Sequence, residues 1–129
     1  MSEEKFTESY FARLREDLVI NDTLKGEPFT FKTTWGLFSP KSIDNGTRLL
    51  IDHLDIRADE QALDLGCGYG PLGLTIARHA PEGHCTMVDK DFVAIEYAKK
   101  NAEINHLSNV DIFLSDGCNH LKPNSSFSL

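Results

Sequence analysis

A glycine-rich stretch at residues 62–73, ALDLGCGYGPLG, has the clearest potential for chemistry in this sequence. Its first four residues predict a short buried strand that runs directly into Gly66, Gly68 and Gly70, and a helix is predicted just beyond them. Glycines suit this place because the chain must turn sharply and let a ligand approach its backbone closely. The stretch therefore predicts a ligand-binding loop between a strand and a helix.

Two classes of ligand fit such a loop, and Asp64 discriminates between them. The spacing of Gly68, Gly70 and Gly73 satisfies the fingerprint of a nicotinamide dinucleotide site. A dinucleotide would place its pyrophosphate here, however, and a carboxylate beside the loop would repel it. S-adenosylmethionine (AdoMet) instead brings a sulfonium cation and an ammonium group, which a carboxylate attracts directly or through water. Asp64 thus favours AdoMet, and a nicotinamide-dependent oxidoreductase remains the alternative.

Two further acids follow the next predicted strands. Asp89 ends the strand HCTMVD, where an acid can accept both ribose hydroxyls of an adenosine. Asp116 follows the strand NVDIFL and is placed to accept from the adenine amine, while Gly117 keeps the approach open. A single acid would more often cap a loop or face solvent. Three acids at the carboxyl ends of successive strands indicate one shared site, because ligands of open α/β sheets bind along that edge.

The elements that position these acids alternate from Gln61 onward as strand, helix, strand, helix, strand. The helix LGLTIARHA ends at Pro81, and Asp91 is predicted to cap a second helix that runs from about Phe92 to Asn105. This alternation predicts parallel strands in the order 3-2-1 joined by right-handed crossover helices. The fold class is therefore α/β, a Rossmann-like half-sheet.

The preceding residues predict a different arrangement. Apolar residues at helical spacing indicate a helix over residues 6–18, and LVINDTL and PFTFKTT predict a β-hairpin with its turn at residues 25–27. A loop at residues 35–46 leads to a helix whose apolar face is assigned to Ile43, Leu50, Ile51 and Leu54. The predicted division is an N-terminal helix, hairpin and lead-in loop at residues 1–41 and an AdoMet-binding domain at residues 42–129.

Two stretches of the sequence resemble a known family. DLGCGYGPLG with Asp89 resembles the first two cofactor motifs of class I AdoMet-dependent methyltransferases. The upstream FTFKTTWGLFSPKSIDNGTRLL resembles the lead-in segment of the "methyltransferase small" family, which includes the guanine-N2 methyltransferases of small-subunit ribosomal RNA. In that family a Gly-aliphatic-Phe-Ser element precedes an Asp-x-Gly, matched here by Gly36, Leu37, Phe38, Ser39, Asp44 and Gly46. The likeness covers residues from about Tyr10 to Gly117.

The resemblance implies methyl transfer from AdoMet to a base amine, guanine N2 of ribosomal RNA. It also implies that Phe38 and Ser39 lie over the methionine end of the cofactor or shape the acceptor entrance. A hydrophobic plug followed by a helix-capping serine is the equal alternative for this pair. The predicted cofactor-binding set is Phe38, Ser39, Asp64, Gly66, Cys67, Gly68, Gly70, Asp89, Lys90, Asp116 and Gly117.

The sequence departs from the family pattern after the third strand. Family members continue with a fourth strand, beside the first, that leads into Asn-Pro-Pro-aromatic, where the target amine is aligned. No Asn-Pro-Pro occurs in the 129 residues, so no catalytic residue is named and a C-terminal truncation is expected. A non-catalytic cofactor-binding module and a methyltransferase of protein side-chain amides therefore stay open. The uncovered first strand would be a free apolar edge, which predicts marginal stability or a homo-oligomer.

Charge and composition limit the classes of partner that we expect for this chain. The net charge of −7 predicts weak binding of nucleic acid by this chain alone, because phosphate contacts use Lys and Arg. The sequence shows no membrane-spanning apolar run and no secretory signal, which predicts a cytoplasmic protein without a membrane partner. Cys67, Cys85 and Cys118 are widely spaced, which indicates reduced thiols and no metal site.

Overall fold

The computed structural model describes residues 17–115 and 127–129. The predicted N-terminal helix, apart from its last residues, and the predicted ligands Asp116 and Gly117 lie outside the described residues. The elements, in chain order, are β1 (Leu18–Leu24), β2 (Glu27–Thr33), α2 (Asn45–His53), β3 (Gln61–Leu65), α3 (Pro71–His79), β4 (His84–Asp89), α4 (Phe92–Ile104) and β5 (Val110–Leu114). None of the helices in the described part of the chain is both long and apolar enough to span a membrane.

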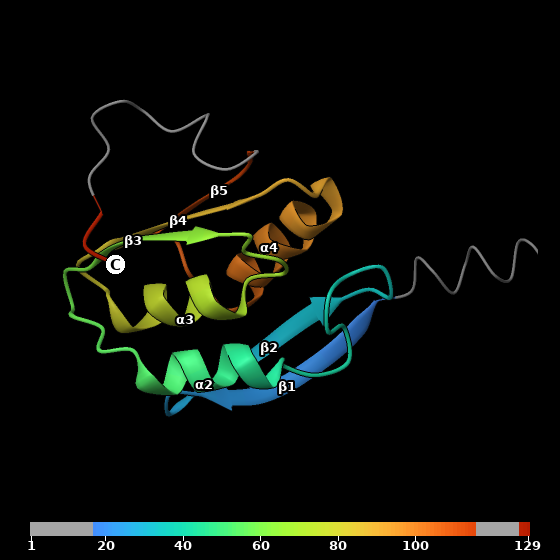
Figure 1. Cartoon of the computed structure of the whole chain (residues 1–129), viewed down its shortest axis with the longest axis horizontal. Helices are drawn as coiled ribbons and strands as arrows, with labels where there is room; N and C mark the ends of the chain where they lie inside the picture. Colours follow the sequence, from blue (N-terminus) through green and yellow to red (C-terminus); the bar gives the residue numbers. More distant parts are fainter. Residues whose placement is uncertain (1–16, 116–126) are drawn as a thin grey trace, which may run out of the picture.

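The strands β3, β4 and β5 form a parallel sheet in that order, which confirms the predicted 3-2-1 half-sheet. Asp64 of β3 pairs with Met87 of β4, and Met87 pairs with Ile112 of β5. The helices α3 and α4 lie on the same face of this sheet (Figure 1). Because all three strands run in one direction, their carboxyl ends share one edge, and Asp64 and Asp89 both lie toward it.

The predicted hairpin is confirmed, with a tight two-residue turn between β1 and β2. Leu24 pairs with Glu27, so the turn consists of Lys25 and Gly26. Both have positive φ, 51° and 82°, as a turn that follows the twist of a hairpin requires. The Lys25 ammonium donates to the carbonyl of Leu54 at 2.5 Å, where α2 ends. A cation is favourable there because the last carbonyls of a helix have no partner within the helix.

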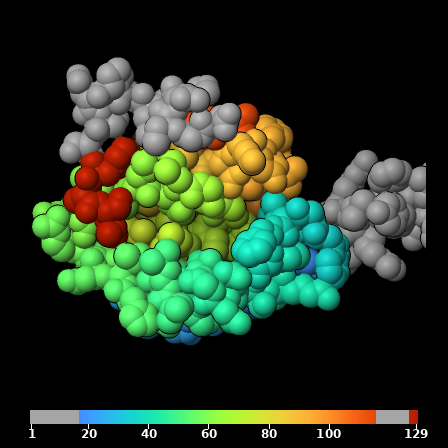
Figure 2. All heavy atoms as spheres, in the orientation of Figure 1, coloured from blue at the N-terminus to red at the C-terminus, as the bar shows by residue number. Residues whose placement is uncertain are grey.

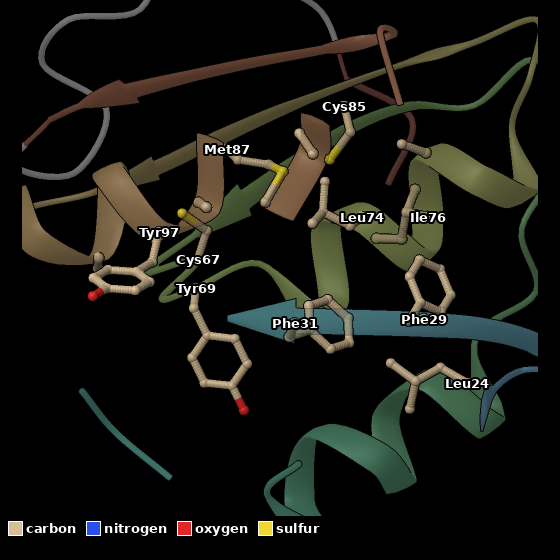
Figure 3. Packing of buried hydrophobic residues seen from close by; sticks show 14 of the residues in the cluster. Leu24, Phe29, Phe31, Cys67, Tyr69, Leu74, Ile76, Cys85, Met87 and Tyr97 are labelled. Carbon is tan, nitrogen blue, oxygen red and sulfur yellow. The ribbon is translucent and has the colours of Figure 1, made fainter. Parts of the chain in front are cut away.

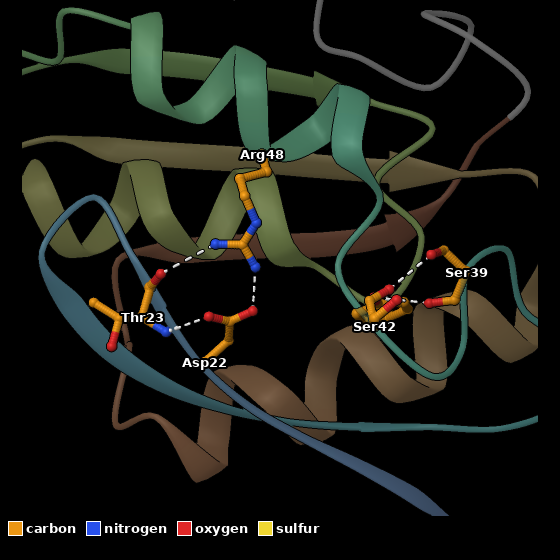
Figure 4. A network of polar contacts seen from close by, with 6 residues as sticks. Asp22, Thr23, Ser39, Ser42 and Arg48 are labelled. Carbon is orange, nitrogen blue, oxygen red and sulfur yellow. Dashed lines mark hydrogen bonds and ion pairs between the residues drawn. The ribbon is translucent and has the colours of Figure 1, made fainter.

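The lead-in helix α2 is held at its N-terminus and by a side chain in its middle. Asp44 caps its N-terminus, where Oδ2 accepts from the Thr47 N–H at 3.1 Å. Arg48 forms an ion pair with Asp22 of β1, and its guanidinium approaches the Thr23 carbonyl at 3.5 Å (Figure 4). The predicted apolar face was wrong at Leu50, which is 47% exposed, because the buried stripe passes through Ile51.

One apolar core joins the hairpin to the sheet (Figure 3). Phe29 and Phe31 of β2 stack with ring centroids 5.5 Å apart, and Phe31 meets the edge of Tyr69 at 5.9 Å. Leu74 of α3 and Met87 of β4 complete the contact from the sheet side, and both are fully buried. The domain boundary between residues 41 and 42 stays a prediction, and core residues from both sides of it pack together.

Two asparagines, Asn101 in α4 and Asn105 at its C-cap, bind the backbone of β2. The Asn101 amide accepts from the Lys32 N–H at 2.7 Å and donates to the Lys32 carbonyl at 2.9 Å. Asn105 repeats this pairing with Thr30, at 3.1 Å and 2.8 Å. The match is geometric: four residues along a helix rise about 6 Å, and two residues along a strand span about 6.7 Å. The two side chains therefore form the hydrogen bonds that a neighbouring strand would form with this edge of β2.

The edge of β3 that was expected to be free is partly paired. Leu129 N–H donates to the Gln61 carbonyl at 3.3 Å, and the Leu63 N–H donates to the Leu129 carbonyl at 3.2 Å. These bonds lie on either side of Ala62, which is the pattern of a parallel pair. The red C-terminal residues accordingly lie beside β3 in Figure 1. The expectation of a free edge was wrong for residues 61–63, and the structure gives no support to self-association there.

Candidate functional site

A cleft of about 420 Å³ opens at the carboxyl ends of β3 and β4. Its walls come from the lead-in loop (residues 35–42), the start of α2, the glycine loop (residues 66–70) and the turn after β4. The sequence-predicted residues among its lining are Phe38, Ser39, Asp64, Gly66, Cys67, Gly68, Asp89 and Lys90. In Figure 2 the lead-in loop, in cyan, and the β3 region, in light green, lie on the same visible face.

The glycine loop makes the sharp bend that the sequence predicts. Gly66, Gly68 and Gly70 have φ values of 68°, 57° and 108°, all in the left-handed region that favours glycine. A Cβ added at Gly66 or Gly68 would meet nothing within 4 Å. The backbone of the loop thus borders open space, so a ligand can approach it closely. Gly70 does not line the cleft; it is the N-cap of α3.

Asp89 connects the end of β4 to the glycine loop. Its Oδ2 accepts from the Gly68 N–H at 2.9 Å, and its Oδ1 accepts from the Asp91 N–H at 2.9 Å. Asp91 in turn caps α4 by accepting from the Val93 N–H, as predicted. A carboxylate oxygen can accept two hydrogen bonds, so each oxygen of Asp89 keeps the capacity to accept a ligand hydroxyl.

Asp64 is buried beneath the glycine loop, with 6% of its surface exposed. Its Oδ2 accepts from the Gly73 N–H at 3.0 Å, in the first turn of α3. The first N–H groups of this helix need an acceptor from elsewhere, because its N-cap Gly70 has no side chain. Burial raises the pKa of the Asp64 carboxyl to about 7, an effect that the Gly73 N–H opposes and the charge of Asp89 reinforces.

The third glycine of the dinucleotide-like spacing has a packing role. A Cβ on Gly73 would lie 2.7 Å from Cγ and Sδ of Met87 and 2.9 Å from Oδ2 of Asp64. Only glycine therefore lets α3 approach β3 and β4 this closely. The third glycine of a dinucleotide fingerprint has the same packing role, so Gly73 does not discriminate between the two classes of ligand.

The cleft is rich in carboxylates. Among the residues that the structure describes, its lining holds four of them, from Asp44, Asp64, Asp89 and Asp91, beside one cation from Lys90. Such a surface attracts a cationic ligand and disfavours a pyrophosphate. Cys67 contributes no charge, since burial raises the pKa of its thiol well above the ordinary range. Within residues 17–115 and 127–129, no cluster of three or more His, Cys, Asp or Glu side chains is arranged for a metal ion.

The structure contradicts one of the two interpretations of Phe38 and Ser39 in the lead-in loop. Phe38 is 78% exposed and therefore is not a hydrophobic plug. Ser39 does not cap α2, because Asp44 does. The Ser39 hydroxyl instead donates to the Ser42 carbonyl at 2.7 Å, within a loop where Ser39 itself has a positive φ of 49° (Figure 4). Phe38 thus forms an exposed apolar wall of the cleft.

Tyr69, within the glycine loop, was not among the residues predicted for this site. Its hydroxyl donates to the Ser39 carbonyl at 3.1 Å and lies 3.4 Å from the Ser42 carbonyl. Its own carbonyl accepts from the Asn101 amide at 2.8 Å. The sequence did contain a signal for this residue: a large amphipathic side chain lies between two glycines, where a small residue would be enough to form a turn.

A second, shallower hollow of about 540 Å³ lies between the hairpin and the C-terminal end of α4. None of the predicted site residues lines it. Its cation, Arg78, lies over the Phe29 ring at 4.3 Å and donates to the carbonyls of Pro28 and Asn105. This hollow is therefore a packing junction, and the functional candidate is the acidic cleft.

Comparison with known proteins shows the family of this chain. The family model of the methyltransferase small domain matches residues 28–128. The YbxB protein of Bacillus subtilis is 43% identical over 94 residues, which cover 72% of this chain and 47% of that protein. The ribosomal RNA small subunit methyltransferase C of Pseudomonas putida is 37% identical over 94 residues, or 73% of this chain and 28% of the relative.

Solved structures show the same fold. The 16S rRNA N2 methyltransferase of T. thermophilus, solved in complex with AdoMet and guanosine, superimposes with a TM-score of 0.78 at 23% identity. That match covers 96% of this chain and 42% of the other. The chain spans about half or less of the length of these relatives. The chain belongs to the methyltransferase small domain family, whose members are AdoMet-dependent methyltransferases.

Proposed function

We propose that this chain binds AdoMet in the acidic cleft and forms the cofactor-binding part of a methyltransferase whose acceptor is guanine N2 in ribosomal RNA. One observation carries the proposal: two strand-end carboxylates and an open, left-handed glycine bend meet in one cleft. The proposed cofactor ligands are Phe38, Ser39, Asp64, Gly66, Cys67, Gly68, Asp89, Lys90, Asp116 and Gly117, whereas Gly70 supports the bend as the N-cap of α3. The proposed cofactor-binding domain is residues 42–129.

The chemistry of the cleft fits an adenosine that carries a positive charge. Asp89 is suited to accept the ribose hydroxyls, since its two oxygens are already oriented by the Gly68 and Asp91 N–H groups. Asp64 lies on the glycine side, where its ionised form is disfavoured by burial and would be favoured by a neighbouring cation. A bound AdoMet would supply an electrophilic methyl group. The chain's own part is to hold that group in a fixed direction.

The acceptor is inferred from the relatives. Ribosomal RNA methyltransferases recur among the similar proteins, and the T. thermophilus complex contains guanosine. Phe38 offers an exposed aromatic surface at the cleft, a suitable wall for a flat base. The net charge of −7 predicts that this chain alone holds RNA weakly, so the remaining RNA contacts are expected elsewhere in the active assembly. An RNA acceptor also keeps the cytoplasm as the expected location.

Transfer of labelled methyl groups tests the acceptor. The active assembly that contains this chain is incubated with methyl-labelled AdoMet and either protein-free ribosomal RNA or a ribosomal protein fraction, and the products are hydrolysed to nucleosides and amino acids. Label in N2-methylguanosine is expected. Label in methylglutamine would replace the proposal by a protein amide methyltransferase. Cofactor binding without transfer to either acceptor would instead identify a non-catalytic module.

A further inference from the structure

Tyr69 connects two walls of the cleft, one through its backbone and the other through its hydroxyl. Its backbone belongs to the glycine loop, between Gly68 and Gly70, and its hydroxyl reaches the lead-in loop at Ser39 and Ser42. The side chain is 3% exposed, so water does not compete for this hydroxyl. Burial raises the pKa of the phenol to about 12, which keeps it a hydrogen-bond donor at neutral pH.

The segment that Tyr69 holds is constrained on its other side as well. The Thr33 hydroxyl at the end of β2 donates to the Pro40 carbonyl, and the Leu37 N–H donates to the Thr34 carbonyl at 3.0 Å. The first contact ties Pro40 to the end of β2, and the second closes a turn directly after β2. The Tyr69 bond is the contact that fixes the middle of the lead-in loop to the glycine loop, next to the exposed Phe38.

We propose that Tyr69 is a positioning residue that couples the glycine loop to the lead-in loop, so that an occupied cofactor cleft sets the position of Phe38 for the acceptor. This inference rests on the proposed function, because it assumes that the cofactor lies against residues 66–70. Tyr69 acts through the Ser39 carbonyl, and its hydroxyl needs no contact with the cofactor or the acceptor. A shift of the glycine loop on binding would pull the lead-in loop with it.

The chain carries its own reporter of this coupling. Trp35 is its single tryptophan, and it lies in the lead-in loop. The ring is 39% exposed, and the Lys41 ammonium lies 4.6 Å from its centroid. Because the emission of indole depends on solvent exposure and on nearby charge, a movement of this loop changes the fluorescence of Trp35. Binding itself can be measured separately by calorimetry.

The test compares the wild-type chain with Tyr69→Phe and Tyr97→Phe, using S-adenosylhomocysteine as the ligand. Both variants lose one phenolic hydroxyl and keep the ring. The Tyr97 hydroxyl donates to Asp17 at 2.5 Å, just before β1, and also contacts the Thr34 side chain next to Trp35, so Tyr97→Phe controls for the loss of a hydroxyl beside the same loop. We expect S-adenosylhomocysteine to change the Trp35 emission of the wild type and of Tyr97→Phe. We expect Tyr69→Phe to bind with affinity reduced at most about fivefold, the value of one neutral hydrogen bond, and to lose the emission change.

Three results would overturn the coupling. An unchanged Trp35 response in Tyr69→Phe would show that the hydroxyl does not transmit it, and a wild type that binds without any response would show that there is nothing to transmit. No binding by the folded wild type would remove the proposed function and the coupling together. Should Tyr69→Phe fail to fold, hydrogen exchange of the wild type decides: ligand must protect amides of residues 36–42 together with those of residues 66–70, and protection of the glycine loop alone contradicts the proposal.

Discussion

The Asp64 carboxylate accepts a hydrogen bond from the backbone N–H of Gly73 at 3.0 Å, which joins the end of β3 to the first turn of α3. The contact gives one buried acid two tasks. It satisfies a helix N-terminus that its own N-cap leaves without a side-chain acceptor, and it places a carboxylate at the cleft. The hydrogen bond to the helix therefore depends on the protonation state of Asp64, and so on pH.

Asp64 is expected to make the unligated chain less stable as the pH rises from about 4 to about 7. Burial raises its pKa in the folded state to about 7, so the folded chain retains a proton that the unfolded chain releases. The free energy of unfolding should fall across this window by on the order of 2–4 kcal/mol, and Asp64→Asn should remove most of that fall. Urea unfolding at both ends of the window measures it. Parallel pH profiles of the two proteins would contradict the assigned role.

Cofactor binding is expected to release a proton from the same carboxyl. A cation in the cleft favours ionised Asp64, so the affinity for AdoMet should rise with pH up to about 7 and then level off. Calorimetry in two buffers of different ionisation enthalpy counts the released protons. Asp64→Asn should show weaker binding and no release from this group. Equal proton release by both proteins would assign the proton to another group.

Gly73→Ala is expected to destabilise the chain by about 1–3 kcal/mol, since its Cβ would overlap with Met87 and Asp64. Gly36→Ala is the matched control, because a Cβ there meets nothing within 4 Å and its φ is not in the left-handed region. The control should stay within about 0.5 kcal/mol of the wild type. Thermal or urea unfolding of both variants provides the comparison. A harmless Gly73→Ala would mean that α3 can move away from the sheet.

Asn101→Ala is expected to lower the free energy of unfolding by about 2–4 kcal/mol, because it removes the side-chain partner of partly buried Lys32 backbone groups and of the buried Tyr69 carbonyl. Asn21→Ala is a suitable control, since Asn21 is exposed and its oxygen only accepts from the Thr30 hydroxyl at 2.7 Å. Hydrogen exchange at the Lys32 amide should accelerate in Asn101→Ala and stay unchanged in Asn21→Ala. Unchanged exchange in both would show that other contacts hold β2.

The sheet order and the glycine bend could be predicted because their signals are local. The apolar strands, the capping Asp91 and the positive-φ glycines each act within a few residues of sequence. The helix α2 was less well predicted, because its short apolar pattern is compatible with two neighbouring faces and tertiary packing selects the one through Ile51.

The features that escaped prediction depend on contacts between distant residues. The Tyr69 hydroxyl meets Ser39, thirty positions earlier in the chain, and no periodicity announces such a pair. The asparagine pairing of α4 with β2 also needs the hairpin to lie beside the helix, which the sequence of either element does not specify. The pairing of Leu129 with β3 likewise depends on where the chain returns to the sheet.

The central claim is that the acidic cleft holds AdoMet, and calorimetric titration of the folded chain tests it most directly. AdoMet and S-adenosylhomocysteine should bind with one site per chain, and NADH should not bind. Asp89→Asn should weaken binding by about tenfold to a hundredfold, the value of one or more hydrogen bonds to a charged acceptor, whereas Asp111→Asn on exposed β5 should not. Tighter binding of NADH than of S-adenosylhomocysteine, or AdoMet binding that is insensitive to Asp89, would contradict the claim.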